Sequence, residues 1–349
     1  MFDPTVLQAL LSRFGLDPLR WHCVAFGTGL INSTWVLKDR DGSIKYILQK
    51  VNHQVFKRPQ DITHNLDLIG KHLSQLHPDY LFVHPLGQHQ TPDGDYYRLF
   101  PFVPGSRTLD VVSRPEQAYE AAQSFARFSH LLSDLDPSRL RETLPHFHDL
   151  SRRYKDFDAS LKGQTSPEIA FLQDHAGYVT ELERLKLSKD FPLRIIHHDT
   201  KISNILFDRQ DKALCVIDLD TVMPGYFISD VGDMMRTYLP PVSEEEQDLD
   251  AVCVRPEYFR AIVAGYLAGM EGGLTSLELQ QFLFAGRFMI YMQALRFLTD
   301  FLSGDVYYGT RYPGHNLARA RNQICLLKSF NASEGVFREI LSELLPVKV

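Results

Sequence analysis

Residues 195–207 read Ile-Ile-His-His-Asp-Thr-Lys-Ile-Ser-Asn-Ile-Leu-Phe, and residues 216–220 read Val-Ile-Asp-Leu-Asp. The apolar residues that begin each stretch predict two short buried strands. Each strand leads directly into polar residues. A strand, a polar loop and a second strand that ends in a carboxylate bring the side-chain oxygens of Asp199, Asn204 and Asp218 to one region of the fold.

These three residues fit the transfer of a phosphoryl group. That reaction asks little covalent chemistry of a protein. It needs a carboxylate that orients the attacking hydroxyl and accepts its proton, and ligands for magnesium at the phosphates. Asp199 is the expected base. Asn204 and Asp218 are the expected magnesium ligands, because Mg²⁺ prefers hard oxygen donors to imidazole nitrogen.

Two other interpretations of this segment stay open. His-His-Asp after an apolar run could form a buried turn or a helix cap, although the spacing through Asn204 to Asp218 argues against it. Alternatively, His197, His198 and Asp199 could be transition-metal ligands of a phosphohydrolase, since imidazole suits zinc or iron. That chemistry usually places the His-Asp pair on a helix, whereas a strand is predicted here.

The composition is that of an ordinary globular protein, with 44% hydrophobic and 23% charged residues. A single core stops growing at about 250–300 residues, so a chain of 349 residues predicts two lobes with a cleft between them. The net charge of -6 disfavours a broad nucleic-acid surface. We find neither a signal peptide nor an apolar run of about 20 residues. We therefore expect a cytoplasmic enzyme without a membrane anchor.

The first lobe is predicted to contain a small antiparallel sheet and one helix. Segments 21–26, 33–38 and 44–51 are rich in β-branched and aromatic residues, and Asp-Arg-Asp-Gly at 39–42 is a hairpin signal. Apolar residues then recur at alternating steps of four and three over 62–76. This spacing predicts a helix with one apolar face.

The lobe boundary is expected after a further strand at 96–100. Pro-Phe-Val-Pro-Gly at 101–105 ends regular structure with two prolines and a glycine. This gives a nucleotide-binding lobe over residues 1–103 and a catalytic and substrate lobe over 104–349. Apolar spacing beyond the boundary predicts mostly helices. The expected fold class is therefore α+β, with a sheet-based first lobe and a larger helical second lobe.

The loop that joins the first two predicted strands is the candidate phosphate lid. Its glycines would let backbone amides approach phosphates, and its hydroxyls add donors. A plain turn is the competing interpretation. The expected nucleotide contacts in this loop are Gly27, Gly29, Asn32, Ser33 and Thr34.

The third strand offers Gln49 and Lys50, whose side chains point to opposite faces. We expect Lys50 to contact phosphates, because a lid, a hairpin and a lysine-bearing strand follow one another in kinases. The next helix lacks the expected Glu partner, so a Gln49–Asn65 hydrogen bond with Lys50 in solvent is the competing arrangement. In the linker, Phe102 and Val103 are expected to contact adenine, since the proline before them has no N–H.

The catalytic segment resembles the aminoglycoside phosphotransferase and choline kinase superfamily. His197, Asp199 and Asn204 match its His-x-Asp-x-x-x-x-Asn loop, Asp218 its metal-binding Asp, and Asp230 a further Asp of the family. His-Asp-Thr-Lys and Gly-Asp-Met-Met-Arg are most similar to bacterial N-acetylhexosamine 1-kinases. The resemblance covers nearly the whole chain. It implies a protein-kinase-like two-lobe fold, ATP as co-substrate with Mg²⁺, and phosphorylation of a sugar at its anomeric hydroxyl.

The resemblance also extends to the C-terminal part of the chain. Sugar hydroxyls need donors and acceptors, which Asp220, Arg296 and Tyr307 are expected to supply. Asp220 lies two residues past Asp218 on the same predicted strand, so both side chains should share a face. A structural role for Arg296 competes, because it lies in an apolar helix. A choline, homoserine or aminoglycoside kinase and a catalytically weak kinase-like binding module remain alternatives, and the oligomeric state is not predicted.

Overall fold

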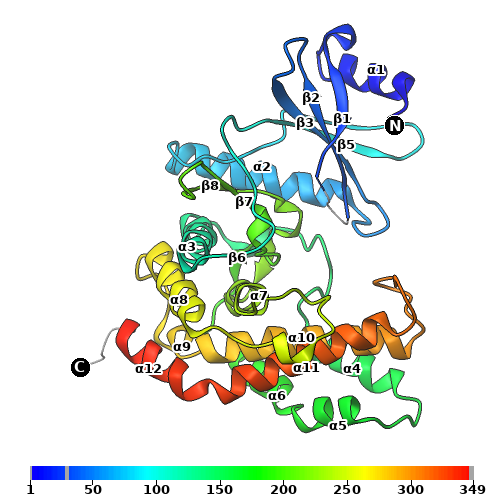
Figure 1. Cartoon of the computed structure of the whole chain (residues 1–349). Helices are drawn as coiled ribbons and strands as arrows, with labels where there is room; N and C mark the ends of the chain where they lie inside the picture. Colours follow the sequence, from blue (N-terminus) through cyan, green and yellow to red (C-terminus); the bar gives the residue numbers. More distant parts are fainter. Residues whose placement is uncertain (1, 28–30, 346–349) are drawn as a thin grey trace.

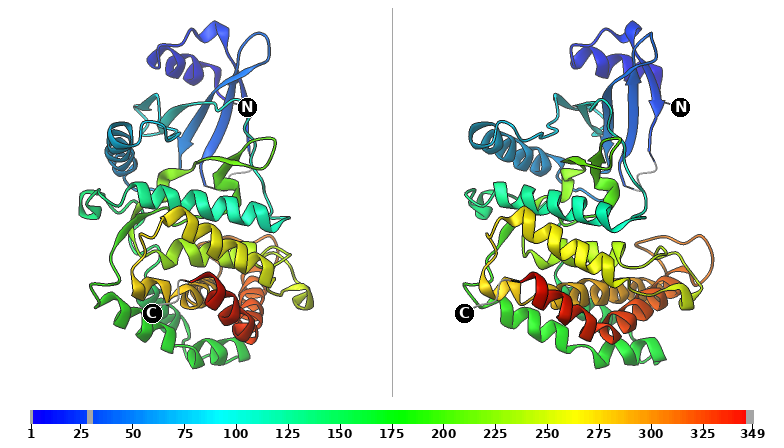
Figure 2. Two further views of the ribbon diagram at one scale, coloured as in Figure 1. Left: turned by 90° about the vertical axis from the view of Figure 1, so that its left-hand side faces the viewer. Right: turned by 60° about the vertical axis from the view of Figure 1, so that its left-hand side comes forward.

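The computed structural model describes residues 2–27 and 31–345 and consists of two lobes (Figure 1). A five-stranded antiparallel sheet forms the centre of the first lobe, and the second lobe is mostly helical. The two further views in Figure 2 show the same division. This confirms the predicted α+β class. Among the described residues, none of the helices is both long and apolar enough to cross a bilayer.

The sheet has the strand order β1-β2-β3-β5-β4. The predicted three-strand meander and the strand before the linker are confirmed. β4 was not predicted, because its residues Gly-Gln-His-Gln have no β-branched or aromatic side chain. The strands are β1 (His22–Ala25), β2 (Ser33–Lys38), β3 (Ile44–Val51), β4 (Gly87–Gln90) and β5 (Tyr96–Pro101).

The two faces of this sheet have different partners. Helix α1 (Pro4–Arg13) packs against one face, in a cluster with Leu48 and Tyr97. Helix α2 (Pro59–Leu76) buries the predicted apolar face. Because side chains alternate along a strand, Gln49 and Arg98 lie on the face opposite α1. That face is directed toward the second lobe.

The second lobe consists of helices packed around one long buried helix, α10. Most of the residues of α10 are buried, so it lies in the core of this lobe and not on its surface. The helices are α3 (Pro115–Leu131), α4 (Leu150–Ser160), α5 (Pro167–Asp174), α6 (Gly177–Lys186), α7 (Ile228–Tyr238), α8 (Pro256–Met270), α9 (Ser276–Leu279), α10 (Phe282–Leu302), α11 (His315–Ala332) and α12 (Glu334–Leu344).

Two small two-stranded antiparallel sheets lie between the five-stranded sheet and the helices. β6 (Arg194–Ile196) pairs with β9 (Met223–Gly225), and β7 (Ile205–Phe207) pairs with β8 (Ala213–Val216). The polar segment that follows β6 therefore connects the β6–β9 sheet to the β7–β8 hairpin. It faces the first lobe, with α7 directly behind it (Figure 1).

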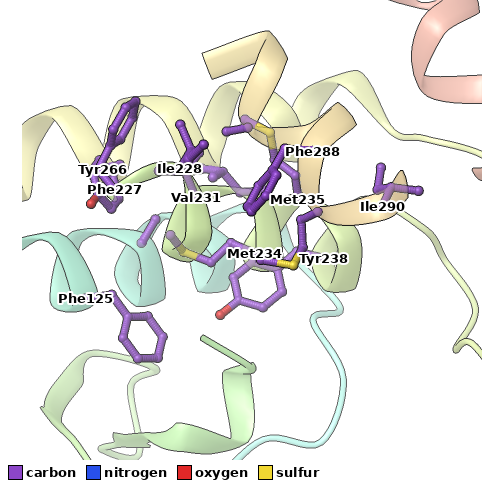
Figure 3. Close-up of a cluster of buried hydrophobic side chains, with 14 of the residues drawn as sticks. Phe125, Phe227, Ile228, Val231, Met234, Met235, Tyr238, Tyr266, Phe288 and Ile290 are labelled. Carbon is purple, nitrogen blue, oxygen red and sulfur yellow. The ribbon is translucent and has the colours of Figure 1, made fainter. Parts of the chain in front are cut away.

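Helix α7 is fixed in the core beneath this polar segment. Figure 3 shows its apolar side chains among residues of α3, α8 and α10, including Phe125, Tyr266 and Phe288. A Cβ added to Gly232 would lie 2.3 Å from the backbone oxygen of Ala285, so α7 approaches α10 this closely only with glycine there. The helix is thus a rigid support for the polar residues on its other side.

Candidate active site

The structure brings Asp199, Asn204 and Asp218 together at the end of the β7–β8 hairpin. The Asn204 side-chain amide donates to the backbone oxygen of Asp199 over 2.9 Å. The backbone N–H of Ile217 donates to the backbone oxygen of Asn204, also over 2.9 Å. Asp218 therefore follows directly beside Asn204. The bond through the Asn204 nitrogen leaves its side-chain oxygen as the atom that can bind a cation.

Helix α7 holds the catalytic loop by its backbone. The two carboxylate oxygens of Asp230 accept hydrogen bonds from the amides of His198 over 2.7 Å and His197 over 3.0 Å. One turn later, Asp233 accepts from the amide of Thr200 over 2.9 Å. These bonds keep His198 at φ 67°, a left-handed conformation that non-glycine residues rarely adopt. The loop geometry is imposed by α7.

Three further interactions complete this support. The Tyr238 hydroxyl donates to the backbone oxygen of Thr200, and Arg236 pairs with Asp233 over 2.9 Å. Burial raises the pKa of Asp230 to about 7, and the two amide donors act against that increase. Sequence reasoning matched Asp230 to the family but gave it and Asp233 no function. Their spacing of three residues on a helix, which puts both on one face, was the available signal.

Asp199 has the environment of a proton acceptor. Its carboxylate lies 3.2 Å from the ammonium of Lys201. Although burial alone raises the pKa of Asp199, the charge of Lys201 and then that of His197 hold it below the ordinary value. The Nδ1 atom of His197 accepts from the Asp199 amide over 3.3 Å, and its Nε2 lies 3.0 Å from the backbone oxygen of Ile217. His197 thus contacts the backbone at Asp199 and at Ile217.

Asp218 has the surroundings of a cation ligand. It follows Ile217 at the end of the β7–β8 hairpin and adopts φ 57°. Desolvation between the lobes, followed by the charges of Asp220 and Asp199, raises the pKa of Asp218 to about 7. A divalent cation would offset that repulsion. One carboxylate and one amide oxygen suit Mg²⁺, which commonly takes its other ligands from water and phosphate.

The transition-metal interpretation is not supported by this geometry. The polar atoms of His197 are directed at backbone groups, and the ring of His198 is buried. Over residues 2–27 and 31–345, no group of three or more His, Cys, Asp or Glu side chains converges in a way that could hold a metal ion. The side-chain oxygens of Asn204 and Asp218 beside Asp199 are donors of the type that a hard cation prefers.

The expectation that Asp220 faces an acceptor sugar is wrong. The Arg98 guanidinium donates to both Asp220 oxygens, over 2.6 and 2.9 Å, and Asn32 donates to one of them over 2.8 Å. Strand β8 ends at Val216, and the left-handed turn at Asp218 breaks the alternation. The two carboxylates therefore do not share a face.

Lys50 is also placed differently from the expectation. Its ammonium lies 2.6 Å from Asp95 and 5.9 Å from the ring centre of Tyr97, on the α1 face of the sheet. The alternative Gln49–Asn65 bond is wrong as well. Gln49 accepts from Arg98 on the neighbouring strand. The Asn65 side chain instead bonds backbone groups of the second lobe.

The glycine-containing loop borders a cavity of about 330 Å³. Gly27 has φ 78°, as a tight turn between strands requires. Ser33 and Thr34 begin β2 at this cavity, and the side chain of Asn32 links the loop to the second lobe. Gly29 lies outside the described residues. The Asn32 side-chain amide is therefore engaged by Asp220.

Of the two linker residues expected to contact adenine, Phe102 has its backbone N–H bonded within the protein, whereas Val103 has its backbone oxygen bonded. The backbone N–H of Phe102 donates to the oxygen of Lys45 over 3.0 Å, which continues the pairing of β3 and β5. The backbone oxygen of Val103 accepts from the hydroxyl of Ser106 over 2.7 Å. The amide of Val103 is thus the linker donor that can face adenine, with the Phe102 side chain half-buried beside it.

Arg296 and Tyr307, the residues predicted to bind the sugar, lie beside each other. The Arg296 guanidinium lies 5.4, 5.9 and 5.4 Å from the ring centres of Phe147, Tyr307 and Tyr308. It donates to the side chain of Gln293 over 3.1 Å. Among the described residues, it has no carboxylate within ion-pair distance. Its charge is therefore balanced by aromatic faces.

A stacked pair of rings connects this cluster to the catalytic loop. The ring centres of Phe147 and His148 are 4.4 Å apart, and those of His148 and His198 are 5.3 Å apart. Burial, followed by His198 and Arg296, holds the pKa of His148 well below its ordinary value. Arg153 lies in the same cluster, where burial and then the charge of Arg296 lower its pKa. Sequence reasoning missed Phe147, His148 and Arg153, since no motif marks them.

Comparison with solved structures identifies the fold. An aminopropanol kinase associated with a microcompartment shares 17% identity, with TM-score 0.66 over 96% of this chain and 99% of that chain. An aminoglycoside phosphotransferase from Alicyclobacillus acidocaldarius shares 13% identity, with TM-score 0.61 over 99% and 96%. A choline kinase from Cryptosporidium parvum shares 12% identity, with TM-score 0.58 over 96% and 98%. At these identities the likeness establishes a kinase-like fold.

A family model matches residues 22–273, which include the glycine-containing loop, the linker and the whole catalytic segment. The match covers more than half of the chain. This chain belongs to the phosphotransferase enzyme family.

Proposed function

We propose that this protein is an ATP- and magnesium-dependent kinase that phosphorylates a hydroxyl group of a small molecule. The observation that carries the proposal is the position of Asp199, beside Asn204 and Asp218 and held by α7. Asp199 would orient the acceptor hydroxyl and accept its proton. Asn204 and Asp218 would hold Mg²⁺, which supplies charge neutralisation at the phosphates when bound.

The nucleotide would lie under the loop that ends at Thr34. The proposal assigns phosphate contacts to the amides of this loop and to the hydroxyls of Ser33 and Thr34. Adenine would meet the linker at Val103. This position for the nucleotide is supported by the cavity at the glycine-containing loop and by the order of loop, sheet and linker along the chain. We keep the division at residues 103 and 104 as the proposed boundary between the nucleotide lobe and the substrate lobe.

The acceptor we propose is a sugar, specifically the anomeric hydroxyl of an N-acetylhexosamine. Hydrogen-bond donors at Arg296 and Tyr307 suit a neutral polyol. Choline would need an aromatic cage around a quaternary cation. Here the rings of Phe147, Tyr307 and Tyr308 already surround the guanidinium of Arg296, which favours an uncharged acceptor. The positive charges of Arg296 and Arg153 also disfavour a polycationic aminoglycoside.

The experiment is coupled ADP release over a panel of acceptors. It includes N-acetylglucosamine, N-acetylgalactosamine, glucose, galactose, choline, homoserine and an aminoglycoside. The proposal expects turnover with N-acetylhexosamines, and loss of turnover when the anomeric hydroxyl is blocked as a methyl glycoside. Preference for choline or for an aminoglycoside would contradict the sugar assignment while leaving the kinase assignment intact. No turnover with any hydroxyl acceptor would favour a binding module.

A further inference from the structure

In the part of the first lobe that the structure describes, Lys50 of the third strand makes no ion pair with the helix that follows it. In protein kinases, a lysine of the third strand pairs with a glutamate of the following helix, and this pair must form for activity. Here Lys50 lies on the α1 face with Asp95. The polar residues of α2 are directed elsewhere, because Asp61 pairs with Arg58 and Arg141. Another group must supply the positive charge on the cleft side.

Arg98 occupies that side of the sheet. It lies directly across from Gln49 in the register of β3 and β5, and its guanidinium donates to the Gln49 side chain. The same guanidinium makes a bidentate pair with Asp220 across the lobe boundary. The Arg98 side chain is 1% exposed and that of Asp220 5%. Bidentate pairs of this kind fix orientation as well as distance.

Asp220 is connected to three parts of the first lobe, directly or through Asn32. Besides Arg98, it accepts from Asn32 at the end of the glycine-containing loop. The Asn32 side-chain oxygen accepts in turn from the backbone N–H of Asn52, just after β3, over 2.9 Å. The loop, β3 and β5 are thus tied to one carboxylate. That carboxylate lies two residues after Asp218, in the same short turn.

We infer that Arg98 is the positioning residue that couples the nucleotide lobe to the magnesium ligand Asp218, acting through Asp220. The inference rests on the proposed function. It gives Arg98 and Asp220 one part of the work of the strand lysine and helix glutamate of protein kinases, which is to connect the sheet to the active site, and leaves phosphate contact to other groups. Arg98 neutralises Asp220, so that Asp218 is left as the carboxylate available to the cation. Together with Asn32, it also fixes the distance between the first lobe and the turn that contains Asp218.

The test measures binding of ADP to the full chain with and without Mg²⁺, by calorimetry. Arg98→Lys keeps the charge but loses the bidentate geometry. Losing a residue that orients a metal ligand typically costs about 10–100-fold in metal affinity or activity. The quantity compared is the ratio of the Kd for ADP without Mg²⁺ to the Kd with Mg²⁺. We expect this ratio to be at least about tenfold smaller in Arg98→Lys than in wild type. Binding of ADP without Mg²⁺ should change less than about twofold, because Arg98 does not contact the nucleotide in this account.

Matched variants separate positioning from folding. Arg98→Met leaves a buried carboxylate without a cation, which threatens folding. The double variant Arg98→Gln with Asp220→Asn removes both charges and keeps hydrogen-bonding groups, and it should share the loss of the Mg²⁺ effect. Arg20→Met is the control in the same lobe, since Arg20 is 59% exposed and pairs with Asp39 on the surface. It should bind ADP as wild type does.

Two outcomes distinguish the inference from the proposed function. A wild type that responds to Mg²⁺ and an Arg98→Lys variant that responds equally would overturn the inference alone, and would make the pair a structural tie. Loss of the Mg²⁺ effect in Lys50→Met, but not in Arg98→Lys, would overturn it as well. A wild type whose ADP binding ignores Mg²⁺ would instead contradict the proposed function.

Discussion

Replacing Asp230 should damage stability and turnover together, because its carboxylate holds two buried amides of the catalytic loop. In Asp230→Ala the amides of His197 and His198 lose their acceptor. A buried donor left without a partner costs about 1–3 kcal/mol, so the two predict a loss of about 2–6 kcal/mol in the free energy of unfolding. This argument holds whether the carboxyl is ionised or protonated. Asp230→Asn keeps one acceptor oxygen and should lose about half as much.

Turnover should fall as well, since His198 would leave its left-handed conformation and move Asp199. A misplacement of about 1 Å can cost about 10²-fold in rate. The assays are guanidinium chloride unfolding and steady-state kinetics. Asp208→Ala is the matched control, because Asp208 also accepts from two backbone amides, each over 2.8 Å, but at an exposed turn where water replaces it. The free energy of unfolding of Asp208→Ala should stay within about 0.5 kcal/mol of the wild-type value. An Asp230→Ala variant as stable and active as Asp208→Ala would refute the reasoning.

The other predictions concern the groups around the reacting atoms. Asp218→Ala should abolish activity and weaken Mg²⁺-dependent nucleotide binding, and support of turnover by zinc in place of magnesium would contradict the assignment. Lys201→Met should raise the pKa of Asp199, because the Lys201 ammonium lowers it. Asp199 must be ionised to accept a proton, so the acidic limb of the pH profile of kcat/KM should move to higher pH; an unmoved limb would contradict this. Arg296→Ala and Tyr307→Phe should raise KM for the sugar and leave KM for ATP nearly unchanged; lost folding cooperativity with unchanged sugar KM would make Arg296 structural.

The parts of the site that the sequence predicted are those set by local spacing. Asp199, Asn204 and Asp218 are separated by a loop and a short hairpin, so the chain itself brings them together. The apolar spacing over 62–76 likewise identified the buried face of α2, because burial follows helical spacing within one element.

The wrong predictions concern residues whose contacts cross between the lobes, or that follow a turn which ends the alternation of side chains along a strand. Asp220 was assigned by strand alternation, which a left-handed residue at position 218 ends. Lys50 was chosen over Gln49 by residue type, but the face of each strand depends on how α1 covers the sheet. Arg98 is 122 residues from its partner, and no local pattern connects the two.

The most direct test of the central claim is the turnover of Asp199→Ala with ATP, Mg²⁺ and the best acceptor of the panel. If Asp199 accepts the proton of the acceptor hydroxyl, kcat should fall by about 10²–10⁴-fold, the usual contribution of a positioned base. The Kd for ADP should change little, since the nucleotide is bound by other groups. A variant that keeps near-full turnover would contradict the assignment of Asp199 and with it the proposed site.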